Sequence, residues 1–256
     1  MKNLQLIKTF LKLICPPVII NLFRKEGYHY SGKYISYKEA QKFSDTYNDK
    51  NSTKKFFTPN DVEVSGRFNI LPILVLSYKK RNIKILDYGG GANPAYSYIE
   101  NSTKVKTQTY VIEQENFCKK IVNKIPKRFK ERVQYYKSLN QLGNLDLDIV
   151  CFNSSIQYLE NYKEILENII KLNPLYILIT RTNFHNGEEN YFALEHYPVG
   201  SSHPYIFFSY QRFTELLESN NYNLVFSNKY NVNKYKHKSI DGSTFYHRDM
   251  LFKYIK

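Results

Sequence analysis

Cysteine is scarce and dispersed in this chain of 256 residues. Its three cysteines, Cys15, Cys118 and Cys151, lie far apart and show none of the short spacings of a metal site. An odd number also leaves one sulfur without an intramolecular partner. We therefore expect reduced thiols, no disulfide framework, no bound metal and a cytoplasmic protein.

The sequence also lacks a recognisable export signal. Its most apolar stretch, residues 4–23, is interrupted by Lys8 and Lys12 and precedes no small-residue cleavage site. Within it, residues 4–14 carry apolar side chains at spacings of three and four, which predicts an amphipathic helix. This helix could pack on the body of the protein, on a second copy in a homodimer, or on the inner face of the membrane; we favour packing on protein.

Acidic residues are outnumbered by basic residues. The chain has 37 Lys and Arg against 23 Asp and Glu, for a net charge of +14. This balance favours anionic partners such as nucleotides, phosphorylated sugars, nucleic acid or a membrane surface. Lysine is abundant together with Asn, Ile and Tyr, so part of the excess reflects general composition, and charge alone does not select among these partners.

Residues 83–94 carry the clearest functional pattern. An apolar β-prone run, residues 83–86, leads into Asp87, Tyr88, Gly89, Gly90 and Gly91. Glycine adopts backbone angles closed to other residues and lets a ligand approach the main chain. Residues 92–99 are expected to form a helix whose free N–H groups face the turn. The pattern predicts a strand, a tight turn and a helix around a nucleotide-like ligand.

A carboxylate follows the next predicted strand. Residues 110–112 are apolar and β-prone, and Glu113 comes after them, about 20 residues beyond the glycines. In nucleotide-binding α/β proteins, an acid at this place accepts hydrogen bonds from both ribose hydroxyls. The glycine turn and the acid together are stronger evidence than either feature alone.

The third glycine of a dinucleotide fingerprint is absent. Counted from Gly89 and Gly91, it would fall at position 94, where this chain has Pro94. S-adenosylmethionine (SAM) has no pyrophosphate, and the hydrophobic-Asp-hydrophobic-Gly-X-Gly pattern of residues 86–91 resembles the first motif of the Rossmann-like methyltransferases. We therefore favour SAM as the cofactor over a nicotinamide dinucleotide.

The rest of the chain alternates helices and strands. Helices are expected at residues 37–44, 66–80, 116–124, 162–172 and 209–220, and strands at 133–136, 147–152, 175–180, 223–230 and 245–254. Residues 1–65 form an N-terminal helical and loop extension over the active site, with an aromatic loop at 24–36. Residues 66–256 form the SAM-binding domain, with an acceptor-binding insert at about 186–209.

Much of the sequence resembles a family of SAM-dependent methyltransferases. The similar segments are Cys15–Pro17, Tyr28–Ala40, Ile85–Gly91, Asp148–Leu159, Arg181–Thr182 and Ser202–Ser209. The resemblance implies an α/β, Rossmann-like class I methyltransferase whose seven-stranded mixed sheet ends in an antiparallel strand pair. It also implies an enzyme of a kind found beside genes for surface polysaccharide, such as lipopolysaccharide O-antigen or capsule.

The expected cofactor site joins the ends of neighbouring strands. By the resemblance, Glu113 would hold the ribose and the glycine turn would approach the methionyl part. The third strand ends at the corner that contacts adenine, and the fourth opens beside the cofactor. The expected cofactor-binding residues are Asp87, Tyr88, Gly89, Gly90, Gly91, Glu113, Ser138, Leu139, Asn153 and Ser154.

Methyl transfer is an in-line displacement, so the protein mainly supplies orientation and, for a hydroxyl acceptor, a base. His185, shortly after the fifth strand, is the first candidate for that base. Arg181 could grip a phosphate or carboxylate of the acceptor, or pair with an acid such as Glu188. The other candidates for the base are Tyr158, His196 and His203.

The resulting hypothesis is a SAM-dependent methyltransferase that acts on a nucleotide-activated or phosphorylated sugar. The methylated group would be a sugar hydroxyl, or a phosphate or phosphoramidate carried on the sugar. No nucleic acid partner is expected, because residues 153–156 lack the Pro-Pro-aromatic signature of enzymes that methylate base amino groups. An RNA methyltransferase or RNA-binding protein, an NAD-dependent oxidoreductase and a non-catalytic methyltransferase-like partner remain alternatives.

Overall fold

A computed structural model describes residues 29–45, 70–78, 80, 82–91, 95–121, 125, 127–143, 145–197, 201–230 and 245–255. The predicted helix at 4–14, Cys15 and Pro94 lie outside these residues. Within the described ranges, no helix combines the length and apolarity needed to cross a membrane. Cys118 and Cys151 are buried free thiols.

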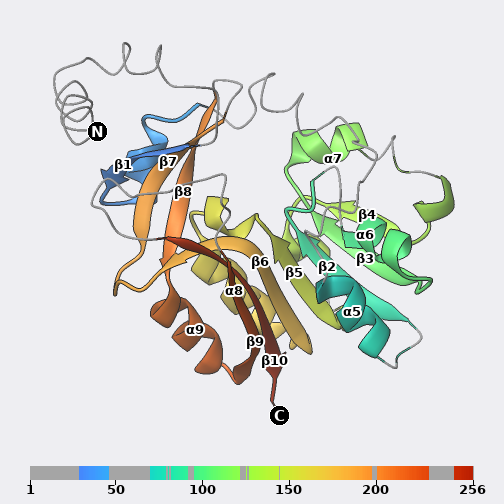
Figure 1. Ribbon diagram of the computed structural model, residues 1–256. Helices are drawn as coiled ribbons and strands as arrows, with labels where there is room; N and C mark the ends of the chain where they lie inside the picture. The colour runs from blue at the N-terminus through green and yellow to red at the C-terminus, as the bar shows by residue number, and fades with distance from the viewer. Residues whose placement is uncertain are drawn as a thin grey trace, which may run out of the picture.

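The described part of the chain contains the predicted seven-stranded mixed sheet, in the order β4–β3–β2–β5–β6–β10–β9 (Figure 1). Its strands are β2 (Ile83–Tyr88), β3 (Thr107–Ile112), β4 (Val133–Tyr136), β5 (Ile149–Asn153), β6 (Tyr176–His185), β9 (Tyr222–Tyr230) and β10 (Tyr246–Tyr254). Strands β2 to β6 are parallel, and β10 runs antiparallel to both β6 and β9. The predicted C-terminal antiparallel pair is therefore confirmed.

Helices cover both faces of this sheet. One face carries α5 (Ile70–Ser77), α6 (Ala95–Ser102) and α7 (Glu115–Ile121), and the other carries α8 (Tyr162–Lys171) and α9 (Tyr210–Glu218) (Figure 1). Side chains alternate along a strand, so Ile85 packs with α5 and α6 whereas Leu86 packs on the opposite face. Short 3₁₀ turns, η2 (Lys127–Phe129), η3 (Leu139–Gln141) and η4 (Ile156–Tyr158), complete the connections.

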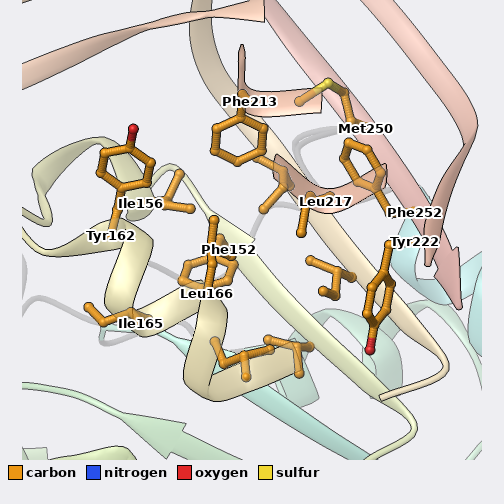
Figure 2. Packing of buried hydrophobic residues seen from close by; sticks show 14 of the residues in the cluster. Phe152, Ile156, Tyr162, Ile165, Leu166, Phe213, Leu217, Tyr222, Met250 and Phe252 are labelled. Carbon is orange, nitrogen blue, oxygen red and sulfur yellow. The ribbon is translucent and has the colours of Figure 1, made fainter. Parts of the chain in front are cut away.

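The largest hydrophobic cluster lies between the sheet and the α8–α9 layer. Phe152 of β5, Leu166 of α8, Leu217 of α9 and Phe252 of β10 meet there, and all four are fully buried (Figure 2). Ser209 begins α9 by accepting a hydrogen bond from the Arg212 N–H, as a helix N-cap does. This cap and the apolar face of α9 fix the helix on the sheet.

Leu217→Ala should lower the free energy of unfolding by about 2 to 5 kcal/mol, because it removes a fully buried side chain and leaves a cavity. Chemical denaturation measures the loss. Val225→Ala on β9 is the control, since Val225 is 51% exposed and its truncation should cost less than about 1 kcal/mol. Equal losses in the two variants would contradict this description of the core.

A second, antiparallel sheet extends from the carboxyl end of β6. It comprises β1 (His29–Tyr34), β7 (Tyr191–His196) and β8 (Ser202–Ser209), and Figure 1 shows it at the upper left. Two residue pairs join it to β6, Phe184 with Phe208 and His185 with Ser209. Helix α3 (Tyr37–Gln41) follows β1 and packs against β7 and β8.

This second sheet corrects two expectations and shows the secondary structure of the predicted insert. Residues 29–34 are a strand rather than part of a loop, and most of residues 186–209 form two strands. The predicted fifth strand, 175–180, continues to His185. Strands β1, β7 and β8 are stabilised by pairing with one another, and the added part of β6 follows an irregular residue, Arg181. Local periodicity in the sequence does not indicate such pairing. An acceptor-binding role for residues 186–209 stays a prediction.

Candidate functional site

Asp87 connects the end of β2 to the start of α6. Its side chain is fully buried, and its Oδ2 accepts a hydrogen bond from the Ala95 N–H at 2.6 Å. The Cys151 thiol donates to Oδ1 at 3.5 Å. Asp87 lies beneath the glycine turn and holds the helix against the strand, and its predicted contact with the cofactor stays a prediction.

Burial raises the pKa of Asp87 to about 7, against the opposing effect of its hydrogen bonds from Ala95 and Cys151. An acid with a raised folded-state pKa binds more protons in the native state than in the unfolded state. Its contribution to stability is therefore fully present below the unfolded pKa, near 4, and is lost as the pH rises through about 7.

Asp87→Asn keeps an oxygen acceptor for the Ala95 N–H but cannot ionise. Between pH 5 and pH 8, the wild type should lose about 2 to 3 kcal/mol of stability relative to this variant. Denaturant unfolding of both proteins at several pH values measures the difference. Parallel pH curves for the two proteins would show that Asp87 has an ordinary pKa.

The three glycines of the turn face different surroundings. A Cβ built at Gly89 would lie 2.6 Å from Cβ of Ser155, and one at Gly90 would lie 2.4 Å from Oδ2 of Asp87. At Gly91, where φ is +59°, a Cβ would meet nothing within 4 Å. Gly89 and Gly90 are thus packed against the protein, whereas the main chain at Gly91 borders open space.

Glu113 lies directly beside this open position. It follows β3, and its Oε2 accepts a hydrogen bond from the Gly91 N–H at 3.1 Å while Oε1 accepts one from the Gln114 N–H at 2.9 Å. A carboxylate has about four lone-pair sites, so each oxygen keeps capacity for one more donor. Burial raises the pKa of Glu113, and the two backbone hydrogen bonds oppose that rise.

The corner after β4 carries the predicted adenine-side residues. Ser138 is exposed at the start of η3 and its side chain caps nothing, while half-buried Leu139 packs against the main hydrophobic cluster. Tyr135, which the sequence did not single out, directs its hydroxyl toward the Gly91 carbonyl oxygen at 3.5 Å. Tyr88 stacks on Phe152 with ring centroids 5.2 Å apart.

Hydrogen bonds join the carboxyl ends of β5 and β6. Thr180 Oγ1 donates to Oδ1 of Asn153 at 2.9 Å, and the Ser154 N–H donates to the Thr180 carbonyl at 2.9 Å. Ser155, at the start of η4, donates through Oγ to the Tyr88 carbonyl at 2.5 Å. The segment that ends at Tyr158 is therefore attached to the residue just before the glycine turn.

A buried carboxylate that the sequence did not reveal lies in the second sheet. Glu195 accepts a hydrogen bond from the Tyr30 hydroxyl at 3.0 Å and a short one from the Tyr158 hydroxyl. The Tyr197 hydroxyl donates to the Tyr158 oxygen at 3.1 Å, and Asn183 Nδ2 donates to the Tyr30 oxygen at 3.2 Å. Reading 191–197 as an alternating strand would have placed Glu195 on the same face as the buried tyrosines.

The predicted histidines lie in other contacts. His185 is buried at the junction of β6 and β8, where its Nδ1 accepts a hydrogen bond from the Gly187 N–H at 3.0 Å and its ring meets Phe245 edge-on. His203 packs against Tyr197 with ring centroids 5.2 Å apart. A catalytic role for His185 stays a prediction. Among the described residues, no group of His, Cys, Asp or Glu side chains is arranged to hold a metal ion.

Arg181 occupies an irregular position within β6. Its φ of +54° is in the left-handed region, and its N–H donates to Oδ1 of Asp249 at 2.8 Å. Burial raises the pKa of Asp249 and of Glu195, and the Arg181 charge opposes the rise in both. The acids around Arg181 are thus Asp249 and Glu195, whereas Glu188, the partner suggested by the sequence, is exposed.

No protein-family model matches the chain, and no curated protein matches its sequence. Solved structures do share its architecture. Magnesium protoporphyrin IX methyltransferase from Synechocystis PCC 6803 superposes with a TM-score of 0.57 over 85% of this chain and 100% of that chain, at 10% identity. The chain has the class I SAM-dependent methyltransferase fold.

A SAM-dependent methyltransferase from Methanosarcina mazei has the same methyltransferase fold, with a TM-score of 0.50 over 72% of this chain and 98% of that chain, at 10% identity. The predicted fold class is confirmed. In this methyltransferase fold, the glycine turn and Glu113 lie at the carboxyl ends of β2 and β3. Open parallel sheets bind ligands at that edge.

Proposed function

We propose that this chain is a SAM-dependent methyltransferase acting on a small-molecule acceptor. The observation that carries the proposal is the pair formed by Gly91 and Glu113. Their 3.1 Å hydrogen bond holds a half-buried carboxylate beside the open side of the turn. The lone pairs that remain on its two oxygens suit the two hydroxyls of a ribose. The Synechocystis neighbour carries bound S-adenosylhomocysteine (SAH).

The residues around this pair fit the other parts of SAM. Glu113 would hold the ribose, the main chain of Gly89–Gly91 the methionyl part, and the corner at Ser138 and Leu139 the adenine. Asn153 and Ser154 would line the space between the cofactor and the acceptor. When bound, SAM supplies an electrophilic methyl group, and the protein contributes orientation and exclusion of water.

We further propose that the acceptor is a nucleotide-activated or phosphorylated sugar destined for a surface polysaccharide, methylated on oxygen. The net charge of +14 favours phosphate-bearing ligands. Hydroxyl, amide and carboxylate side chains gather around Tyr158, and such groups hydrogen-bond to sugar hydroxyls. The sequence resemblance to methyltransferases of polysaccharide gene clusters supports the same acceptor class.

Calorimetric titration with SAH tests the cofactor, and transfer of labelled methyl groups from SAM to uridine-diphosphate-linked hexoses tests the acceptor. We expect micromolar SAH binding and label on the sugar. Failure of the folded protein to bind SAH would overturn the enzymatic proposal and favour a non-catalytic partner role. Salt-dependent RNA binding together with labelling of RNA would show that the acceptor is RNA and not a sugar.

A further inference from the structure

Carboxylate side chains are rarely buried inside a protein, and Glu195 is one that is. Its side chain is 6% exposed on the central strand of the second sheet. A buried carboxylate is costly unless hydrogen bonds compensate it. Here the Tyr30 and Tyr158 hydroxyls donate to its two oxygens. The surroundings therefore maintain a proton-accepting group in a site from which water is largely excluded.

Tyr158 connects this carboxylate to the cofactor side of the molecule. Tyr158 is the last residue of η4. Ser155, at the N-cap position of η4, donates a 2.5 Å hydrogen bond from its Oγ to the Tyr88 carbonyl. Tyr88 immediately precedes the glycine turn. Tyr158 is also half-buried, whereas Glu195 is buried, so the tyrosine is the more accessible member of the pair.

The charges around the pair suit proton transfer from a neutral group. Burial raises the pKa of Glu195, opposed by hydrogen bonds from Tyr158, Tyr197 and Tyr30 and by the charge of Arg181. Burial also raises the pKa of Tyr158 well above its ordinary value, so this phenol stays protonated on its own. The other titratable side chains facing the pair are Tyr205 and His203 on β8.

We propose that Tyr158 and Glu195 form the proton-accepting pair for a hydroxyl acceptor, with Tyr158 in contact with the acceptor and Glu195 acting through it. This inference rests on the proposed methyltransferase function. The acceptor O–H donates its proton to the Tyr158 oxygen as the Tyr158 proton passes to Glu195. The acceptor oxygen forms the new bond to the methyl group, the bond from that methyl to sulfur breaks, and the sulfur keeps the electron pair.

The same geometry favours a hydroxyl over a phosphate or phosphoramidate oxygen as the methylated group. A phosphate or phosphoramidate oxygen at Tyr158 would bring a negative charge next to Glu195 and would need no base.

The first test compares Tyr158→Phe and Glu195→Gln with Tyr191→Phe, a matched loss of a buried hydroxyl that donates to the Gly32 carbonyl at 2.7 Å. With uridine-diphosphate-linked hexoses, kcat should fall about 100-fold or more in the first two variants and stay within about twofold in the control. SAH affinity should be unchanged in all three. The wild-type kcat should rise with pH as Glu195 ionises, and Glu195→Gln should lose that dependence.

Full kcat in Glu195→Gln, or methyl groups found on phosphate, would overturn the inference. Absence of SAH binding by the wild type would instead refute the proposed function itself. A second measurement needs no acceptor: the infrared difference between wild type and Glu195→Gln, recorded with SAH bound from pH 5 to pH 9. A carboxyl that ionises within this range supports the pair, and one that stays protonated at pH 9 excludes it as a base.

Discussion

Glu113→Ala is expected to weaken SAH binding at least about 100-fold, because in the proposed cofactor site it would remove two charge-assisted hydrogen bonds to the ribose, each worth about 1.5 to 3 kcal/mol. Glu113→Gln keeps one oxygen acceptor and should fall between alanine and the wild type. The cost in folding stability should be only about 1 to 2 kcal/mol, because the two backbone N–H groups that Glu113 now accepts lie beside solvent and can bond to water. Calorimetry and thermal unfolding measure the two effects separately.

Glu115→Ala provides the matched control. It removes a carboxylate two residues away, one that forms exposed ion pairs with Lys119 and Lys137. Because this carboxylate is engaged with lysines outside the glycine turn, its loss should leave SAH affinity unchanged. A Glu113→Ala protein that binds SAH as tightly as the wild type would remove the main support for the cofactor site.

Alanine at two adjacent glycines should have opposite consequences. At position 90 the new Cβ would lie 2.4 Å from Oδ2 of Asp87 and 3.0 Å from Cγ1 of Val111. Asp87 cannot yield without losing the hydrogen bond from Ala95, so Gly90→Ala should cost about 2 to 5 kcal/mol of folding stability. Denaturant unfolding measures this loss.

Gly91→Ala has no such neighbour, because nothing lies within 4 Å of the added Cβ. Its left-handed φ of +59° should cost only about 1 to 2 kcal/mol. The Cβ would project into the space assigned to SAM, so SAH affinity should fall more than stability does. The reverse result, a severe folding defect at Gly91 and a mild one at Gly90, would contradict the described turn.

The sequence predicts the seven-stranded sheet well, because each of its central strands is a short apolar run bounded by turns. Strand β4 begins and ends where expected, and Ser209 caps its helix. The pairing of Gly91 with Glu113 was also predictable, because the carboxyl ends of neighbouring parallel strands meet. These features depend on the local sequence pattern of each strand and on the known topology of parallel α/β sheets.

The second sheet depends on contacts that no local pattern records. Tyr30 pairs with Glu195 across 165 residues, and the segment around Tyr30 lacks the apolar run of a core strand. The location of Asp87 also depends on such tertiary contacts, whereas its position in the motif predicts contact with the ligand. Its burial under α6 follows from the packing of the helix on the turn.

Strand β6 belongs to both sheets. Its first part pairs with β5, nearly its whole length pairs with β10, and its last two residues pair with β8. Because β6 pairs within both sheets, we expect it to hold the second sheet, including Glu195, in place on the first. Selectivity among acceptors should then depend on side-chain shape rather than on domain closure. Variants with altered acceptor choice are best sought on the inner faces of β7 and β8.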